Sequence, residues 1–139
     1  MKRFVYAIIA VIVAVGSLFV LTACDGPNSA AWSVVTNNNE QVLSNGFSQT
    51  VGSARSGHRN RTFELTAAQL ANIRIDSTST AGTITLTISA NGELDGTEIV
   101  MDISDFNGTI DAGHLGAGRI RFQLRHEETR NTSTTITWN

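Results

Sequence analysis

Hydrophobic and polar residues alternate along most of the chain after residue 46. Residues two apart on a strand share one face, so each alternating row predicts a half-buried strand. The clearest row is Ile84, Leu86 and Ile88, which alternates with Thr and Ser at residues 83–89 and favours a pleated strand over a helix. Phe47, Gln49 and Val51 form a further short strand that ends at Gly52. The other rows of alternating apolar residues are Phe63/Leu65, Ile73/Ile75, Ile99/Met101/Ile103, Ile120/Phe122/Leu124 and Ile136/Trp138.

Short segments rich in Gly, Asn, Asp, Ser or Thr separate these rows and are typical of turns and loops. We predict them at residues 53–57, 77–82, 91–96, 106–108, 112–118 and 127–132. A helical turn competes in one segment, residues 66–71. There Thr66 would be the N-cap, and a plain connection between strands fits the segment equally well.

This pattern gives about seven to nine short strands at a spacing of roughly 8–12 residues. Parallel strands would need crossover helices, and the pattern predicts none. We therefore expect an all-β fold, a single antiparallel β-sandwich over residues 46–139. Residues 24–45 are rich in Asn and Ser and are expected to form a tether, with an edge strand at residues 31–35. Trp32 in that strand either packs on the domain or touches a ligand.

The N-terminus carries a different pattern. Lys2 and Arg3 precede an apolar stretch from Phe4 to Val20, which ends in Leu21-Thr22-Ala23-Cys24 and is followed by Asp25-Gly26-Pro27. This arrangement resembles the lipobox signal peptide of bacterial lipoproteins. The resemblance implies that residues 1–23 are removed, that the Cys24 thiol carries a diacylglycerol and that the new amino terminus is acylated, commonly with palmitate.

On that interpretation the rest of the chain is held at the cell membrane by lipid, on the extracytoplasmic side. Residues 4–23 are also long enough for an uncleaved transmembrane anchor, and an ordinary secretory signal is the third alternative. Each alternative exports the domain that follows Cys24.

The composition after Cys24 bears on partners and redox chemistry. That part has no lysine, eight arginines and all twelve acidic residues, a formal charge of −4. The balance gives no electrostatic reason to expect a nucleic-acid partner. Cys24 is the only cysteine, so the sequence excludes an internal disulfide.

Four segments occur in the order seen in jelly-roll-like sandwiches of exported bacterial proteins. They are Phe63-Glu64-Leu65, the Ile84/Leu86/Ile88 strand, residues 116–122, in which glycines precede an alternating strand, and Ile136-Thr137-Trp138. Residues 60–138 thereby resemble pre-peptidase C-terminal domains. The resemblance implies a jelly-roll-like β-sandwich and is used for the fold alone.

Candidate catalytic and metal-binding groups are few. His58, His114 and His126 are the available bases, and no nucleophile-elbow pattern accompanies them, so we expect no enzyme. Asp102, Asp105, Asn107 and Asp111 cluster in sequence, and the oxygens of Asp105 and Asn107 have the two-residue spacing of calcium loops. A full loop needs more carboxylates and a bidentate glutamate, and turn capping explains Asp105 and Asn107 without a metal. We expect no metal and no cofactor.

The sharpest surface feature is a row of arginines, Arg119, Arg121 and Arg125, on the polar face of the strand at residues 119–125. These guanidinium groups could bind acidic sugars, an anionic envelope polymer or lipid phosphates. The competing interpretation pairs them with nearby carboxylates on a solvated sheet face, those of Glu98 and Asp102 or of Glu127 and Glu128. The sequence thus predicts a membrane-anchored binding or envelope-interaction module. An accessory subunit of an envelope complex is the alternative, and a hydrolase is less favoured.

Overall fold

The computed structural model describes residues 28–139. The signal peptide and Cys24 lie outside these residues. Short elements join the strands at one end: the helical turn α2 (Ala67–Leu70) and the 3-10 turn η1 (Gly113–Leu115). The strands are β1 (Ala30–Thr36), β2 (Asn39–Leu43), β3 (Gly46–Leu65), β4 (Ile73–Thr78), β5 (Ala81–Ala90), β6 (Ile99–Asp102), β7 (Asp105–Ile110) and β8 (Gly118–Trp138). The predicted all-β, antiparallel class is confirmed.

The two long strands β3 and β8 lie at the centre of the sheet. They pair along their whole length, from Gly46 opposite Thr137 to Leu65 opposite Gly118. On the outer side of β3, β2 pairs with its first half and β1 with its second half. On the outer side of β8, β5 pairs with the first half and β4 with the second, and β6 and β7 continue from these.

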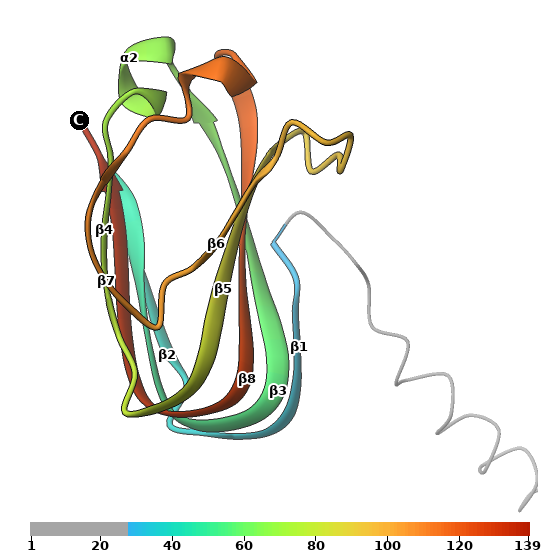
Figure 1. The fold of residues 1–139 in the computed structure, drawn as a ribbon, viewed down its shortest axis with the longest axis vertical. Helices are drawn as coiled ribbons and strands as arrows, with labels where there is room; N and C mark the ends of the chain where they lie inside the picture. Colours follow the sequence, from blue (N-terminus) through green and yellow to red (C-terminus); the bar gives the residue numbers. More distant parts are fainter. Residues whose placement is uncertain (1–27) are drawn as a thin grey trace, which may run out of the picture.

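The sheet therefore resembles five long strands that all bend near their middle, so that its two halves face each other (Figure 1). The sequence suggested a sandwich of separate sheets, whereas the described strands all belong to one open sheet. The bend is continuous because β3 and β8 keep their pairing through it.

Left-handed residues produce this bend. Positive φ angles occur at Val34 (49°) and Asn37 (50°) along the β1–β2 edge and at Glu128 (52°) and Asn131 (46°) in β8. Gly82, with φ of 75°, lies against β8, where a Cβ would come within 2.4 Å of the Glu127 carbonyl oxygen. Left-handed residues turn a strand without ending its pairing.

Three of the predicted turns are wrong. Residues 53–57 continue β3, residues 127–132 continue β8, and residues 106–108 lie inside β7. Each has the small or polar composition of a turn, but its backbone pairs with neighbouring strands, so the chain stays extended. Of the turn predicted at residues 77–82, only residues 79–80 lie outside β4 and β5 and separate them.

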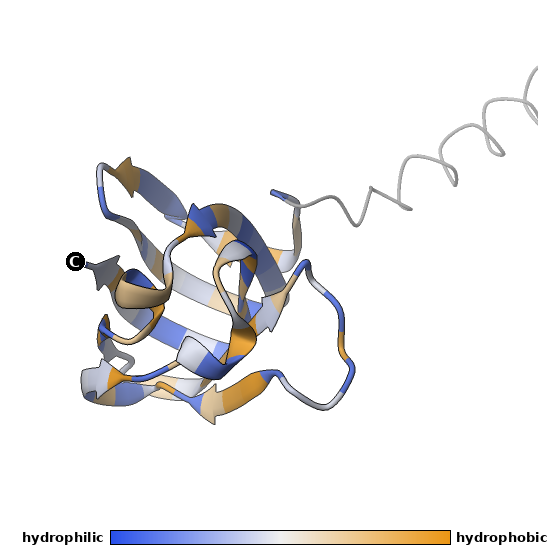
Figure 2. Cartoon of the chain, turned by 90° about the horizontal axis from the view of Figure 1, so that it is seen from above, coloured by the Kyte–Doolittle hydropathy of each residue, from blue (hydrophilic) through white to orange (hydrophobic). Residues whose placement is uncertain are grey.

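The core lies between the two halves of the sheet. Ile84, Leu86 and Ile88 are fully buried, as their alternation predicted. Four aromatic rings, those of Phe47, Phe63, Phe122 and Trp138, contact one another with centroids 4.8–6.2 Å apart. Seen from above, the strands surround this interior, and the short α2 lies across its end (Figure 2).

The helical turn α2 forms where the sequence allowed one. Thr66 is its N-cap: its Oγ1 accepts from the Gln69 amide at 3.3 Å, and its own amide donates to Gln69 Oε1 at 2.9 Å. Leu70 is fully buried, and its carbonyl accepts from the Ala112 amide at 2.8 Å. α2 and the segment leading to η1 thus close the end of the core together.

The described part of the segment expected to form a tether, residues 28–45, is mostly sheet. The predicted edge strand is present as β1, and β2 adds a second one. Pairing begins before β1, since the Thr62 amide donates to Asn28 Oδ1 at 3.1 Å and the Asn60 amide to the Ser29 carbonyl at 2.8 Å. Asn28, four residues after Cys24, is therefore already part of the folded unit. Within residues 28–139, no helix has the length and apolar character needed to cross a membrane.

Candidate functional site

The three arginines of the predicted row lie on the outer face of β8, opposite the buried Ile120, Phe122 and Leu124. They are not equivalent. Arg119 and Arg125 are exposed, whereas Arg121 is half-buried. The row therefore presents two accessible guanidinium groups, about 20 Å apart along the strand at 3.3 Å per residue.

Arg121 packs under the loop that follows β5. A Cβ added to Gly92 would meet its Cζ at 2.4 Å, and its Nε is buried without a hydrogen-bond partner. Its side chain also borders a small hollow of about 50 Å³ that Leu94 helps to line. These contacts assign Arg121 to supporting the loop at residues 91–98, and they remove it from the accessible row.

The carboxylates proposed as partners of the row are mostly engaged elsewhere. Glu98 Oε2 accepts from the Gly96 amide, and Asp102 Oδ1 accepts from the Ser104 amide and hydroxyl, hydrogen bonds that lower the pKa of Asp102. Glu128 lies 3.8 Å from Arg55. Only Glu127 pairs with the row: its Oε1 lies 3.3 Å from Arg125 Nε, with both side chains more than 60% exposed. Exposed pairs of this kind contribute about 0–1 kcal/mol, so Arg125 is weakly held.

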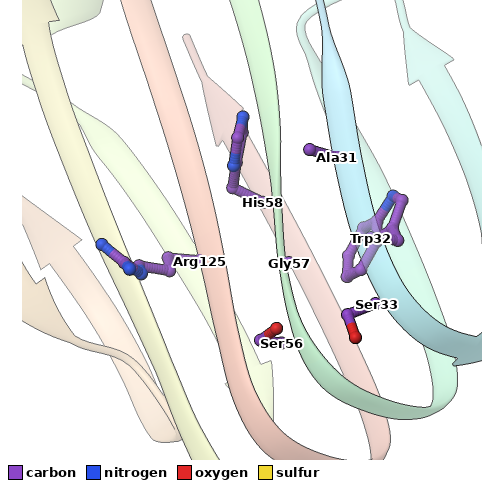
Figure 3. Close-up of a pocket in the computed structure, with 7 residues that line it drawn as sticks. All are labelled: Ala31, Trp32, Ser33, Ser56, Gly57, His58 and Arg125. Atoms are coloured by element: carbon purple, nitrogen blue, oxygen red, sulfur yellow. The ribbon is translucent and has the colours of Figure 1, made fainter. Parts of the chain in front are cut away.

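A hollow of about 330 Å³ lies beside Arg125, across β1, β3 and β8 (Figure 3). His58 lies directly opposite Arg125 in the paired strands. The hollow is lined by Ala31, Trp32, Ser33, Ser56, Gly57, His58 and Arg125. Four of these residues are small, which leaves space between the larger side chains.

Trp32 supports this hollow from the inner face of the sheet. It is opposite Gly57, and a Cβ at Gly57 would lie 2.4 Å from Trp32 Cε3. The absence of that Cβ lets the indole lie across β3 and reach the His126 ring, whose centroid is 5.2 Å away. The structure therefore shows Trp32 packed on the domain, one of the two roles that the sequence left open, at a position that also borders the hollow.

His126 is buried behind Trp32 in a polar part of the interior. Its Nε2 donates to Gln49 Oε1 at 3.2 Å, and its Nδ1 accepts from the Thr129 hydroxyl at 3.2 Å, the tautomer that this pair of partners requires. Gln49 in turn donates to Asn38 Oδ1 at 3.2 Å. Burial lowers the pKa of His126 to about 4, so the ring is neutral near pH 7. Its position gives it a structural role.

A second charged group joins β2 to the far half of β3. The Glu40 carboxylate bridges Arg59 and Arg61, with Oε2 2.5 Å from Arg59 Nε and Oε1 bonded to Arg61 Nε. All three side chains are at most 20% exposed. The Arg59 contact is an ion pair without hydrogen-bond alignment, because that Nε has no hydrogen-bond partner. We call this group the Glu40 bridge; it holds the sheet halves together beside the edge strands.

The remaining candidate residues serve local structure. His114 Nε2 donates to the Thr97 carbonyl at 2.9 Å. Asn107 Oδ1 accepts from Arg74 at 2.7 Å, and Asp111 Oδ1 accepts from the Gly113 amide at 2.8 Å. In the described part of the chain, no three His, Cys, Asp or Glu side chains gather where they could hold a metal ion.

The chain matches none of the known protein-family models and none of the curated proteins with which it was compared.

The sequence did not reveal the hollow. Ser56 and Gly57 were assigned to a loop, and Ser33 to an edge strand of unknown pairing within the expected tether, so the sequence did not predict that they meet beside Arg125. The one available signal was the pairing of a large Trp32 with a stretch of small residues, which is too general to define a site.

Proposed function

We propose that this chain is a membrane-anchored bacterial lipoprotein, held by lipid on Cys24 on the extracytoplasmic side. Its folded part would be a binding module for an anionic polymer of the cell envelope. The lipobox-like Leu21-Thr22-Ala23-Cys24 supports the anchor. The short step from Cys24 to Asn28 would keep the module close to the membrane, since four residues span at most about 14 Å. We also propose that residues 60–138 are related to the jelly-roll-like β-sandwich domains of exported bacterial proteins.

One observation carries the binding proposal: Arg119 and Arg125 project from the same outer face of one long strand and are open to solvent. A guanidinium presents a planar fork of donors that matches carboxylate and phosphate groups. The weak pair between Arg125 and Glu127 is easily exchanged for a ligand. The half-buried Arg121 positions the neighbouring loop without meeting the ligand.

The test measures binding of the purified full-length protein in detergent to an acidic polysaccharide at low and high salt. We expect binding at low salt that falls as salt rises, because screening shortens to about 8 Å at physiological ionic strength. The double variant Arg119→Gln/Arg125→Gln should lose it. Arg74→Gln, an exposed arginine on β4 in the other half of the sheet, is the matched control. Absence of binding by the unaltered protein at low salt contradicts the proposal.

The second candidate function is binding of a protein partner, as an accessory subunit of an envelope complex. The exposed edge of strand β1 favours this function. Residues 30–36 contain no charged side chain, and Val34 is 71% exposed. Uncharged edge strands offer unpaired backbone groups to another chain. A pull-down from native envelope that is lost with Val34→Lys would support an accessory-subunit role over polymer binding.

A further inference from the structure

We propose that the hollow beside Arg125 is a subsite for one oxyanion-bearing unit about the size of a single sugar. The oxyanion would be a carboxylate or a phosphate. This inference rests on the proposed function, because it names the part of an anionic polymer that the outer face recognises.

The polar groups around the hollow are mainly donors. Arg125 supplies a guanidinium whose one ion pair with the described residues uses only its Nε. Ser33 and Ser56 add hydroxyl groups from the two neighbouring strands, and within residues 28–139 neither hydroxyl has a hydrogen-bond partner. Three residues with donor groups, from three strands, line one volume, and such groups suit an oxyanion, which accepts hydrogen bonds and donates none.

The size of the hollow limits the ligand. Its volume of about 330 Å³ lies at the lower end of the roughly 300–1,000 Å³ of small-molecule sites. That volume suits one sugar-sized unit. The rest of a polymer would run along the outer face of β8 toward Arg119, outside the hollow. Arg125 would therefore recognise one unit of the polymer. Arg119 would add electrostatic attraction that depends little on the chemistry of that unit.

The floor of the hollow is fixed before a ligand arrives. The Trp32 ring is held against Gly57 and His126, and His126 is held by Gln49 and Thr129. A fixed floor lowers the cost of ordering the site on binding. Because Trp32 borders the hollow and Trp138 lies in the aromatic core, Trp32 also provides a fluorescence signal near the ligand.

The test titrates the full-length protein in detergent with glucuronate, with glycerol phosphate and with glucose, and follows tryptophan fluorescence. We expect saturable binding of at least one of the two anions and none of glucose. The two anion arms distinguish a carboxylate from a phosphate ligand. Arg125→Gln should weaken binding about tenfold or more, since a charged hydrogen-bond partner is lost. Ser56→Leu, which fills the hollow at unchanged charge, should weaken it as well, and Arg119→Gln should leave it within about twofold.

Glucose binding as strong as that of the anions, or an equal loss from Arg119→Gln and Arg125→Gln, would overturn the subsite. If an acidic polysaccharide binds but neither small anion does, the subsite is wrong while the proposed function stands. If a small anion binds as expected and the polysaccharide does not, the subsite stands and polymer binding is wrong. Thermal unfolding of each variant shows that a loss of binding is not a loss of folding.

Discussion

At the scale of single residues, His126 makes stability depend on pH. Its pKa is lowered to about 4 by burial, against an ordinary value of 6.5, so the unfolded chain binds a proton that the folded chain does not. The stability is therefore fully present above about pH 6.5 and is lost as pH falls toward 4. Between pH 7 and pH 5 the loss should reach about 2 kcal/mol.

Urea unfolding at both pH values measures this. His126→Gln should be less stable at pH 7 and should show a flatter pH dependence. His114→Gln, which alters an exposed ring, should keep the slope of the unaltered protein. Equal slopes for the unaltered protein and His126→Gln would show that His126 does not control the acid response.

Val34 is the second residue with a stability consequence. A β-branched side chain at φ of 49° is strained, and the left-handed conformation costs about 1–2 kcal/mol for such residues. Asn tolerates this conformation, so Val34→Asn should stabilise the protein by about 1 kcal/mol and raise Tm by roughly 4 °C. Val42→Asn, an exposed valine of β2 without a positive φ, is the control and should be neutral or slightly destabilising. A lower Tm for Val34→Asn would contradict the assigned bend.

The sequence alone could not have predicted the roles of the buried polar residues or the difference between the arginines. Gln49 and His126 are both polar, and an alternation of apolar and polar residues does not by itself show that a polar residue is buried. Their burial depends on mutual hydrogen bonds between strands 77 residues apart. Likewise, nothing local distinguishes the packed Arg121 from the exposed Arg125, since Gly92 and the loop around it decide the difference.

At the scale of elements, the Glu40 bridge makes the clearest prediction. Removing the carboxylate leaves two mostly buried guanidinium groups facing each other without a counter-charge. Loss of one partner from a buried pair costs about 3–5 kcal/mol, and the partial exposure here reduces the expected cost of Glu40→Gln to about 1–3 kcal/mol.

Chemical denaturation at neutral pH measures the cost, and Glu127→Gln is the matched control. Its carboxylate also meets an arginine, but both side chains are mostly exposed, so the change should cost well under about 1 kcal/mol. If the two variants are equally stable, β2 is not held to the far half of β3 by this bridge.

The elements were predictable where alternation was regular and unpredictable where the sheet bends. The alternating rows at residues 84–88, 120–124 and 136–138 predict both a strand and its buried face, because apolar residues two apart on a strand lie on the same face. The segments at residues 53–57 and 127–132 have the composition of turns. They stay extended because β3 and β8 pair through the bend, and that pairing is a property of distant residues.

At the scale of the whole molecule, the antiparallel all-β class followed from the strand pattern and from the absence of predicted helices. The single folded-over sheet was not predicted, since it requires knowing that five neighbouring rows of strand residues bend at one level. The early start of the folded unit at Asn28 was also missed, because the Asn- and Ser-rich composition of residues 24–45 is shared by tethers and by edge strands.

This early start makes the anchor the central claim, because Cys24 would place the outer face and its hollow close to the membrane. The intact mass of the protein extracted from the membranes of cells that produce it tests the claim directly. We expect the mass of residues 24–139 with acyl groups on Cys24, and Cys24→Ala should instead leave the larger precursor. A mass that corresponds to the unmodified chain from Met1 in the unaltered protein would contradict the account.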